Sequence, residues 1–485
     1  ANTTGSNHTA MGLGALDANT TSAANSAFGR DALGANTTGD DNTATGYASL
    51  YTNTTGSANV AMGYKALYFS TTAANNTAIG FEALRANTTG SENAAVGRNA
   101  LYANTTGTDN TAVGVYALNA NTTAVNNTAI GRLALYTNTT GYANSAVGKD
   151  AMLSNTTGNS NVAIGYDSLQ ANTTGATNVA VGASALLNNT TAADNVAVGV
   201  SALAANTTGT NNTAVGRAAL STNTTASGNT AVGQTALQLT TTGANNTAVG
   251  KSALTANTTG ASNTGLGRNA LTLNTTGGNN VSVGDLCLAA NTTGADNTAV
   301  GANALNDNTT GKENTAFGYF ALQANTSADN NTAIGRLALY ANTTGTLNTA
   351  VGAATLDANT EGDNNTAVGV AALGLSTTGD GNVGVGYHAL KANTTGTSNT
   401  AVGQRANEVT TTGINCTMIG SLSRSSGVAV NNEVVLGSND MVGKGASTAF
   451  ISGGGGAVYA GNNATAFAQT SDRRIKKDII PNNKG

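Results

Sequence analysis

Residues able to carry metal or acid–base chemistry are few and scattered in this sequence. The two histidines, His8 and His388, stand near opposite ends of the chain, and the two cysteines, Cys287 and Cys416, are also far apart. Metal sites and nucleophilic catalysis need several such groups within a few ångströms. The one adjacent acidic pair, at 40–41, is typical of a solvated surface. We therefore expect no metal, no cofactor, no disulfide and no enzymatic centre.

Basic and aromatic side chains concentrate at one recurring position, directly after a repeated glycine. The basic members are Arg30, Arg98, Arg132, Lys149, Arg217, Lys251, Arg268 and Arg336, and the tyrosines are Tyr47, Tyr64, Tyr166, Tyr319 and Tyr387. One interpretation is a stripe that binds surface polysaccharide by stacking and charge. The other, which we favour, is a solvated face whose long side chains cover apolar surface with their stems.

The glycine before that position recurs with a 17-residue period from Gly12 to Gly437, giving 26 glycines in register without insertion or deletion. Reading from the glycine, the unit is G-x-x-A-L-x-A-N-T-T-G-x-x-N-T-A-V. Loops of globular domains tolerate insertions freely. An array this regular implies that each unit stacks on the next in the same shape.

Each unit holds two short apolar groups bounded by turn residues, and each group fits a strand of a few residues. Stacked strands predict an all-β fold, a parallel β-solenoid with one 17-residue rung per unit. Asparagines four residues before the glycine can hydrogen-bond along the stack as a ladder, and the glycines suit a positive φ or a close backbone approach. The expected ladder residues are Asn76, Asn93, Asn110 and Asn127 with Gly80, Gly97 and Gly114.

Strand alternation places apolar groups on both faces of the expected strands. Thr77 and Ile79 share one face while Ala78 takes the other, and Ala83 and Leu84 are expected on opposite faces. A solenoid with such short rungs has a thin interior that cannot cover both faces. We therefore expect identical chains to bury the second face, in a parallel, in-register homotrimer.

Composition excludes further classes. Charged residues make up 9% of the chain, with a formal net charge of -4, so nothing indicates a nucleic-acid partner or an anionic membrane surface. No stretch of about 18 apolar residues is present, so no membrane span is expected. Plentiful Ala, Val and Leu argue against a charged disordered chain.

The N-T-T triplets, such as Asn87-Thr88-Thr89, have the pattern of N-glycosylation acceptors. Ladder and turn chemistry is the interpretation that we favour, because stacking already needs these asparagines. Threonine columns also occur in ice-binding solenoids, but neighbouring threonines of a strand point to opposite faces, so no flat Thr-x-Thr array is expected.

The unit resembles the head repeats of trimeric autotransporter adhesins, for example in the run from Asn110 to Leu118, N-T-A-V-G-V-Y-A-L. The resemblance implies left-handed parallel β-rolls with three chains in each fibre. It also implies an extracellular protein that adheres to a cell or host surface.

A second resemblance lies near the C-terminus. The run from Ser471 to Lys476, S-D-R-R-I-K, is similar to the opening of the endosialidase-type intramolecular chaperone of phage tail fibres. The resemblance implies trimer assembly followed by self-cleavage before Ser471, with Ser471 and Lys476 as the reacting pair. A desolvated lysine readily loses its proton and can serve as base for a hydroxyl nucleophile.

We expect three segments: the repeat array at 1–437, a neck or cap at 438–470, and the start of the chaperone domain at 471–485. Because Ala1 falls in mid-unit and the chaperone motif stops early, we expect further chain on both sides. The expected function is a structural fibre shaft, on a cell surface or a virion tail, that displays a tip. The alternatives are a spike whose glycan-hydrolysing part lies outside this segment, and an ice-binding solenoid.

Overall fold

The computed structural model describes residues 3–452, 457–460 and 468–470, and the chain forms two compact units, Ala1–Lys251 and Ser252–Gly485. The first unit contains one three-residue strand in each 17-residue rung: β1 (Thr9–Met11), β2 (Ser26–Phe28), β3 (Thr43–Thr45), β4 (Val60–Met62), β5 (Thr77–Ile79), β6 (Ala94–Val96), β7 (Thr111–Val113), β8 (Thr128–Ile130), β9 (Ser145–Val147), β10 (Val162–Ile164), β11 (Val179–Val181), β12 (Val196–Val198), β13 (Thr213–Val215), β14 (Thr230–Val232) and β15 (Thr247–Val249).

The second unit continues the same spacing and then changes it. Its strands are β16 (Thr264–Leu266), β17 (Val281–Val283), β18 (Thr298–Val300), β19 (Thr315–Phe317), β20 (Thr332–Ile334), β21 (Thr349–Val351), β22 (Thr366–Val368), β23 (Val383–Val385), β24 (Thr400–Val402), β25 (Thr417–Ile419), β26 (Val434–Leu436), β27 (Ala449–Ser452), β28 (Ala457–Ala460) and β29 (Ala468–Thr470). The described residues contain no helix.

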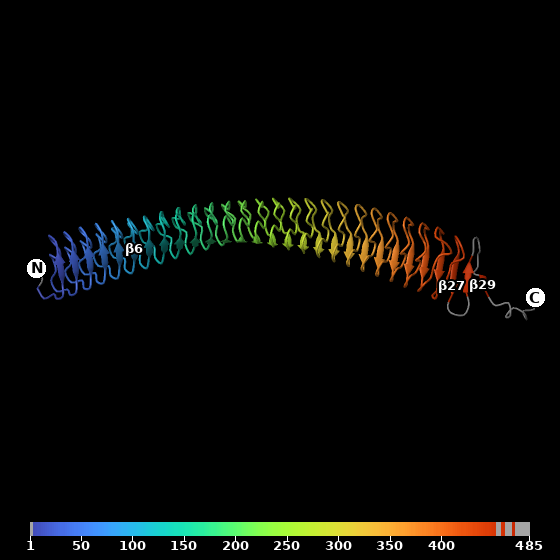
Figure 1. The fold of residues 1–485 in the computed structure, drawn as a ribbon, viewed down its shortest axis with the longest axis horizontal. Helices are drawn as coiled ribbons and strands as arrows, with labels where there is room; N and C mark the ends of the chain where they lie inside the picture. The colour runs from blue at the N-terminus through green and yellow to red at the C-terminus, as the bar shows by residue number, and fades with distance from the viewer. Residues whose placement is uncertain (1–2, 453–456, 461–467, 471–485) are drawn as a thin grey trace, which may run out of the picture. The chain divides into compact units, whose positions relative to one another are not determined.

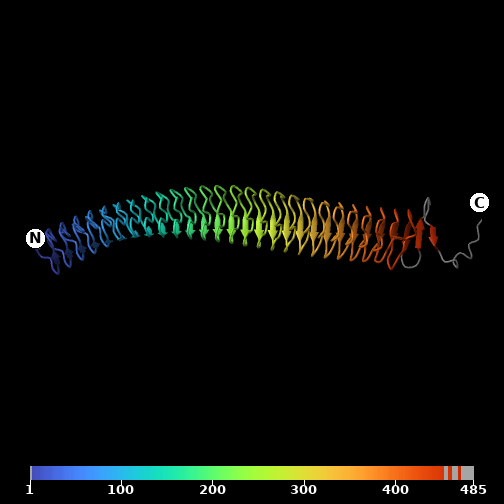
Figure 2. The same cartoon turned by 45° about the horizontal axis from the view of Figure 1, so that its top comes forward.

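Within each unit, the strands of successive rungs pair in parallel, as Thr77 with Ala94 and Ile79 with Val96. Figure 1 shows the strands as a row of arrows, each followed by a looped return, and Figure 2 shows the same rows from another side. Both units are therefore parallel β-solenoids with 17-residue rungs, which confirms the expected fold class. The pattern changes near the C-terminus, where β28 pairs antiparallel with both β27 and β29.

The prediction of a second strand in each rung is wrong. Residues around Ala83 and Leu84 form turns, and both side chains are fully buried instead of lying on opposite faces. The reason is the backbone of Leu84, whose φ of 54° is left-handed and cancels the alternation of a strand. A left-handed leucine costs about 1–2 kcal/mol, which is offset by burying its side chain, worth about 1.5–3 kcal/mol. Backbone hydrogen bonds between rungs, such as Leu84 N to Ala100 O at 2.9 Å, hold the turn in place.

The strand itself alternates as expected. Ala78 is fully buried, Thr77 is half-buried and Ile79 is exposed, so the interior is lined by small alanines of the strand and leucines of the turn. One apolar column, that of Ile79 and its equivalents directly before the glycines, stays on the surface of the single chain.

The interior also contains two columns of buried asparagines. The strand-entry asparagines stand four residues before the glycine: Asn93 donates through N and Nδ2 to Asn76 Oδ1 at 3.0 and 3.2 Å. The turn asparagines begin the N-T-T triplets: Asn104 Nδ2 donates to Asn87 Oδ1 at 2.8 Å. Asn93 and Asn104 both donate to the carbonyl oxygen of Gly107, at 2.9 and 3.0 Å. The two columns thus satisfy each other and the buried turn carbonyl.

The backbone conformation at the end of each strand, and the close approach of the next rung, require glycine there. At Gly114 φ is 140°, and a Cβ would lie 2.5 Å from the carbonyl oxygen of Gly131 in the next rung. Both conditions exclude a larger residue without a shift of the backbone.

We predict that Gly114→Ala lowers the free energy of unfolding by about 2–3 kcal/mol, because the new Cβ meets backbone and φ is unfavourable for alanine. Gly384→Ala is the control, since Gly384 lies within a strand where other rungs carry alanine and a Cβ meets nothing closer than 3.3 Å. Chemical denaturation followed by circular dichroism measures both. Equal effects of the two substitutions would contradict this account of the glycine column.

The turn-asparagine column is interrupted where a hydroxyl residue takes its place. At Ser70 and at Ser376, the serine Oγ and the Oδ1 of the preceding ladder residue, Asn53 or Asn359, are buried without a hydrogen-bond partner. An orphaned buried polar group costs about 1–3 kcal/mol. These interruptions are therefore weak points of the ladder.

We predict that Ser70→Asn raises the free energy of unfolding by about 1–3 kcal/mol, because it restores a donor for Asn53 Oδ1 in a slot that already fits asparagine in other rungs. Ser160→Asn makes the same exchange at an exposed loop position and should change stability by less than about 0.5 kcal/mol. Hydrogen exchange of the adjacent turns reports the local gain. A gain no larger than that of the control would argue against the interrupted-ladder account.

Candidate functional site

The position after the glycine starts the turn that leaves the strand, and in the first rungs it carries a stack of rings. Tyr47 stacks on Tyr64 and Tyr64 on Phe81, with ring centroids 5.4 and 5.1 Å apart and interplanar angles of 13° and 9°. The guanidinium carbon of Arg30 lies 5.8 Å from the centroid of Tyr47, over its ring. Arg98, next along the column, lies over another ring, that of Tyr116, at 4.9 Å.

A second aromatic column, which the sequence analysis missed, lies five residues after the glycine. Tyr51 stacks on Tyr68 at 5.5 Å. Further along, Arg85 lies over the ring of Tyr102 at 5.6 Å, and its Nη1 donates to the tyrosine hydroxyl at 2.7 Å. The signal in the sequence was the spacing of four between the two tyrosines of one rung, as in Tyr47 and Tyr51. This spacing indicates two neighbouring columns only once both residues are known to belong to the same turn.

The two columns frame a hollow of about 160 Å³, lined by Asp31, Tyr47, Ala48, Tyr51, Lys65 and Tyr68. Three of these residues, Asp31, Ala48 and Lys65, occupy the second position after the glycine in consecutive rungs. The hollow exists because the middle residue of the three is small. We call this feature the tyrosine hollow.

Charges around the tyrosine hollow are partly paired. Arg30 Nε lies 3.2 Å from Asp31 Oδ2, and Arg85 Nε lies 3.3 Å from Glu82 Oε1. The Lys65 ammonium lies over two rings, 5.2 Å from the centroid of Tyr64 and 5.4 Å from that of Tyr68. Within the described ranges, no carboxylate lies at ion-pair distance from Lys65.

The remaining basic residues of the expected stripe do not share one arrangement. Lys149 lies over Tyr166 at 4.8 Å and 2.5 Å from Asp150 Oδ2, a hydrogen bond that raises the pKa of this lysine. Arg268 pairs with Asp285 at 2.7 Å. Among residues that the structure describes, no carboxylate pairs with the others, which are Arg132, Arg217, Lys251 and Arg336. Rings and cations gather mainly in the first rungs.

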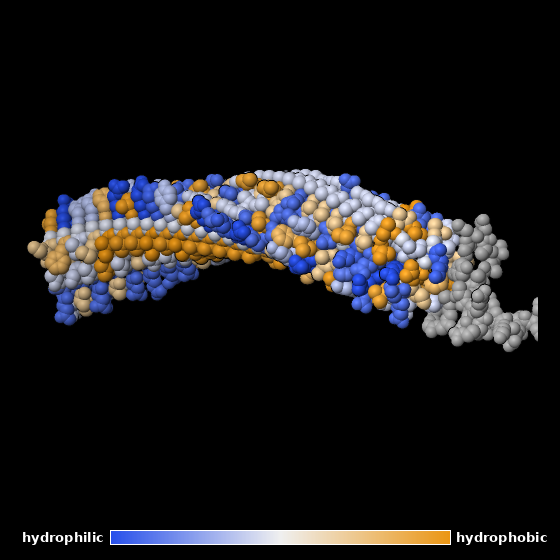
Figure 3. Space-filling view, turned by 45° about the vertical axis from the view of Figure 1, so that its right-hand side comes forward, coloured by the Kyte–Doolittle hydropathy of each residue, from blue (hydrophilic) through white to orange (hydrophobic). Residues whose placement is uncertain are grey.

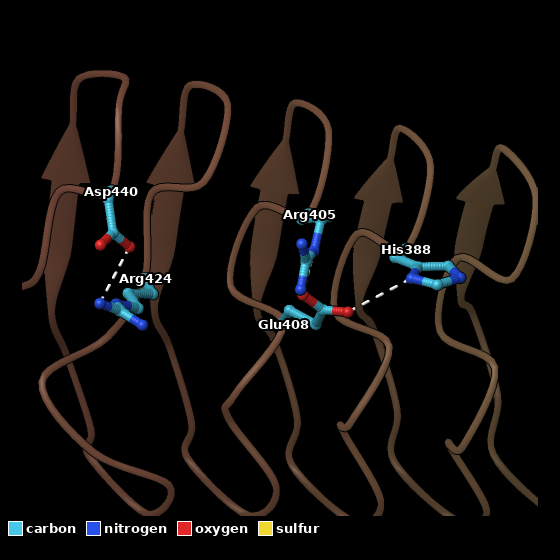
Figure 4. Close-up of polar contacts among 5 residues, drawn as sticks. All are labelled: His388, Arg405, Glu408, Arg424 and Asp440. Atoms are coloured by element: carbon cyan, nitrogen blue, oxygen red, sulfur yellow. Dashed lines mark hydrogen bonds and ion pairs between the residues drawn. The ribbon is translucent and has the colours of Figure 1, made fainter.

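The second unit carries a polar cluster on its last regular rungs (Figure 4). Glu408 accepts from His388 Nδ1 at 3.3 Å and from Arg405 Nε at 2.6 Å, and Arg424 Nη2 lies 2.9 Å from Asp440 Oδ1. Most of these residues also line a hollow of about 340 Å³, together with Val409 and Leu422. Because each arginine already has a carboxylate partner, the cluster joins rungs rather than offering free charge.

The residues considered for acid–base or metal chemistry are not brought together. No group of three His, Cys, Asp or Glu side chains in the described residues could hold a metal ion. Asp40 Oδ1 accepts from the backbone N of Ala23 at 2.6 Å, which is a structural role. Cys416 occupies a strand-entry asparagine slot, where its Sγ donates to Val430 O at 3.1 Å. Burial raises the pKa of the Cys287 thiol to about 11.

The N-T-T asparagines are closed to modification in the folded chain. Asn87 is fully buried, and its Nδ2, the atom that a glycan would take, donates to Gly90 O at 2.8 Å. Thr88 Oγ1 in turn donates to Thr105 O at 3.0 Å. Ser471 and Lys476, the expected self-cleavage pair, lie outside the described residues.

Comparison with protein-family models, with curated proteins and with solved structures found no match to this chain. In the portion that the structure covers, no helix has the length and apolarity to cross a membrane. The arrangement of the residues themselves therefore carries the functional argument.

We predict that neither cysteine is alkylated by iodoacetamide at pH 8 in the folded protein, because both thiols are buried and burial raises the pKa of each. In denaturant both should react fully. Mass spectrometry counts the adducts, and a cysteine added by Thr89→Cys, on the exposed turn, is the positive control. Rapid native labelling of Cys287 would contradict its placement inside the stack.

Proposed function

We propose that the chain is the shaft of an extracellular fibre, a parallel and in-register homotrimer that adheres to or recognises a surface and displays a tip. The observation that carries the proposal is the unbroken repetition of one rung with an apolar column left on its surface. The residue before the repeated glycine is apolar in each rung except that of Thr45, and a repeated face of this kind suits a partner with the same repeat. The fibre is located on a cell surface or a virion tail, and its role is structural rather than enzymatic.

The apolar column contains the residues directly before the repeated glycines. Figure 3 shows a hydrophobic band along the first unit. Many members of the column are more than a third exposed, including Ile79 at 37% and Ile130 at 40%. Exposed apolar patches that run over many residues mark interaction surfaces in soluble proteins. A second copy in register meets the column with an identical one and covers it from end to end.

The resemblance to adhesin head repeats supports three chains and a left-handed coil. The resemblance at Ser471 supports an assembly role for the following chain, with self-cleavage by Ser471 and Lys476. A fibre of this kind transmits force and holds a binding end away from its base. An alternative is a spike whose glycan-hydrolysing part lies outside this segment.

Analytical ultracentrifugation tests the assembly. We predict a trimer for the wild type, and at least about a tenfold weaker association for the double variant Ile130→Asp with Ile164→Asp, because each carboxylate would have to be desolvated in the contact. Thr140→Asp, on the exposed side of the turn, should leave the trimer intact. A wild-type chain that is folded by circular dichroism yet monomeric at all concentrations would contradict the proposal.

A further inference from the structure

The second position after the glycine forms a column of side chains in which Ala48 is a small member, and Ala48 lies at the base of the tyrosine hollow with only 4% of its surface exposed. Its neighbours in the column are an acid, Asp31, and a base, Lys65. The tyrosine columns close the hollow on two sides, with Tyr47 and Tyr51 from the rung of Ala48 itself. The tyrosine hollow is therefore a small space between two tyrosine columns, lined mainly by polar atoms and about the size of a single sugar ring.

The rings offer edges and hydroxyl groups rather than open faces. Tyr47, which lines the hollow, stacks on Tyr64 and has the Arg30 guanidinium over its ring, and Tyr64 in turn stacks on Phe81. The other wall is stacked in the same way, Tyr51 on Tyr68. A nucleic-acid base needs an exposed ring face to stack on. A sugar can instead use its hydroxyl groups as donors and acceptors to the polar atoms that line the hollow.

The charge at the hollow favours an anion. Asp31 is paired with Arg30, whereas the described residues give Lys65 no carboxylate partner. Its ammonium lies over the rings of both tyrosine columns, where it is held in place at the rim. An ammonium with this placement can form a charge-assisted hydrogen bond to a carboxylate.

We propose that the tyrosine hollow binds one acidic pyranose unit of a polysaccharide, with its carboxylate on Lys65, its hydroxyl groups on Asp31 and the tyrosine hydroxyls, and its ring over Ala48. The proposal rests on the proposed function as a surface-binding fibre and names the ligand class and the residues. The residues that line the hollow follow the repeated glycines, whereas those of the apolar column precede them, so the two sets do not overlap.

Isothermal titration calorimetry with the full chain tests the site. The probes are trigalacturonic acid, its carboxyl-reduced neutral trimer, and a short oligothymidylate of the same net charge. The wild type should bind the uronate at least about tenfold more tightly than the neutral trimer, and Lys65→Gln should remove this preference. Ala48→Leu should weaken uronate binding about tenfold or more by filling the hollow.

The filling variant is compatible with the fold, because Leu133 and Leu286 occupy the same column with φ of 59° and 54°, and Ala48 has 51°. Ala218→Leu makes the identical change in the same column, where the second aromatic column is absent, and should leave affinity unchanged. Uronate binding that survives Ala48→Leu, equal binding of the neutral trimer, or tighter binding of the oligothymidylate would overturn the proposal. Failure to bind any probe by a chain that is trimeric in the ultracentrifuge would overturn the site while leaving the proposed fibre intact.

Discussion

The whole structure depends on keeping polar groups satisfied inside a very thin core. So short a rung has little apolar volume, yet each turn buries a carbonyl group that water cannot reach. Asparagine can satisfy this carbonyl and also bond to its neighbours, because its side chain carries both an acceptor and two donors. Asn93 and Asn104 use their donors on the carbonyl of Gly107 and on the asparagine of the previous rung, and the same pattern recurs where both columns keep their asparagines. Without the two ladders the turns would carry orphaned carbonyls along the whole stack.

The same arrangement separates structural positions from positions that are free to vary. Alanine, leucine, asparagine and glycine recur inside because each has a fixed task there. The second position after the glycine carries residues as different as Ala48, Lys65 and Tyr116, since the left-handed backbone there restricts φ but admits side chains of different size and charge. Chemistry can therefore be changed rung by rung without disturbing the stack. The tyrosine hollow is one such local change.

Much of the fold can be predicted from the sequence, because the repeat alone dictates identical stacked units. The strand around Ala78 and the alternation of Thr77 and Ile79 follow from it. The turn at Leu84 does not, because a leucine at positive φ is favoured only by the burial and hydrogen bonds of the finished stack. The tyrosine hollow could be predicted only in part. The column of Tyr47 is evident in the sequence, but that of Tyr51 becomes relevant only when the turn brings the two columns together. The sequence shows at Ser70 that an asparagine is missing from the column. The free-energy cost of that change is evident only from the structure, where the neighbouring Asn53 is left without a donor.

The stacking of successive 17-residue rungs in register has an evolutionary consequence. Because the backbone and ladder hydrogen bonds recur in most regular rungs, loss or gain of a 17-residue unit by recombination between neighbouring repeats preserves this pairing and changes only the side-chain contacts particular to the rungs involved. Each such event would change the number of stacked strands by one, and with it the length of the stack by one inter-strand spacing, about 4.8 Å. A gene of this kind can thus change the length of its product in equal increments of one rung, without passing through a misfolded intermediate length.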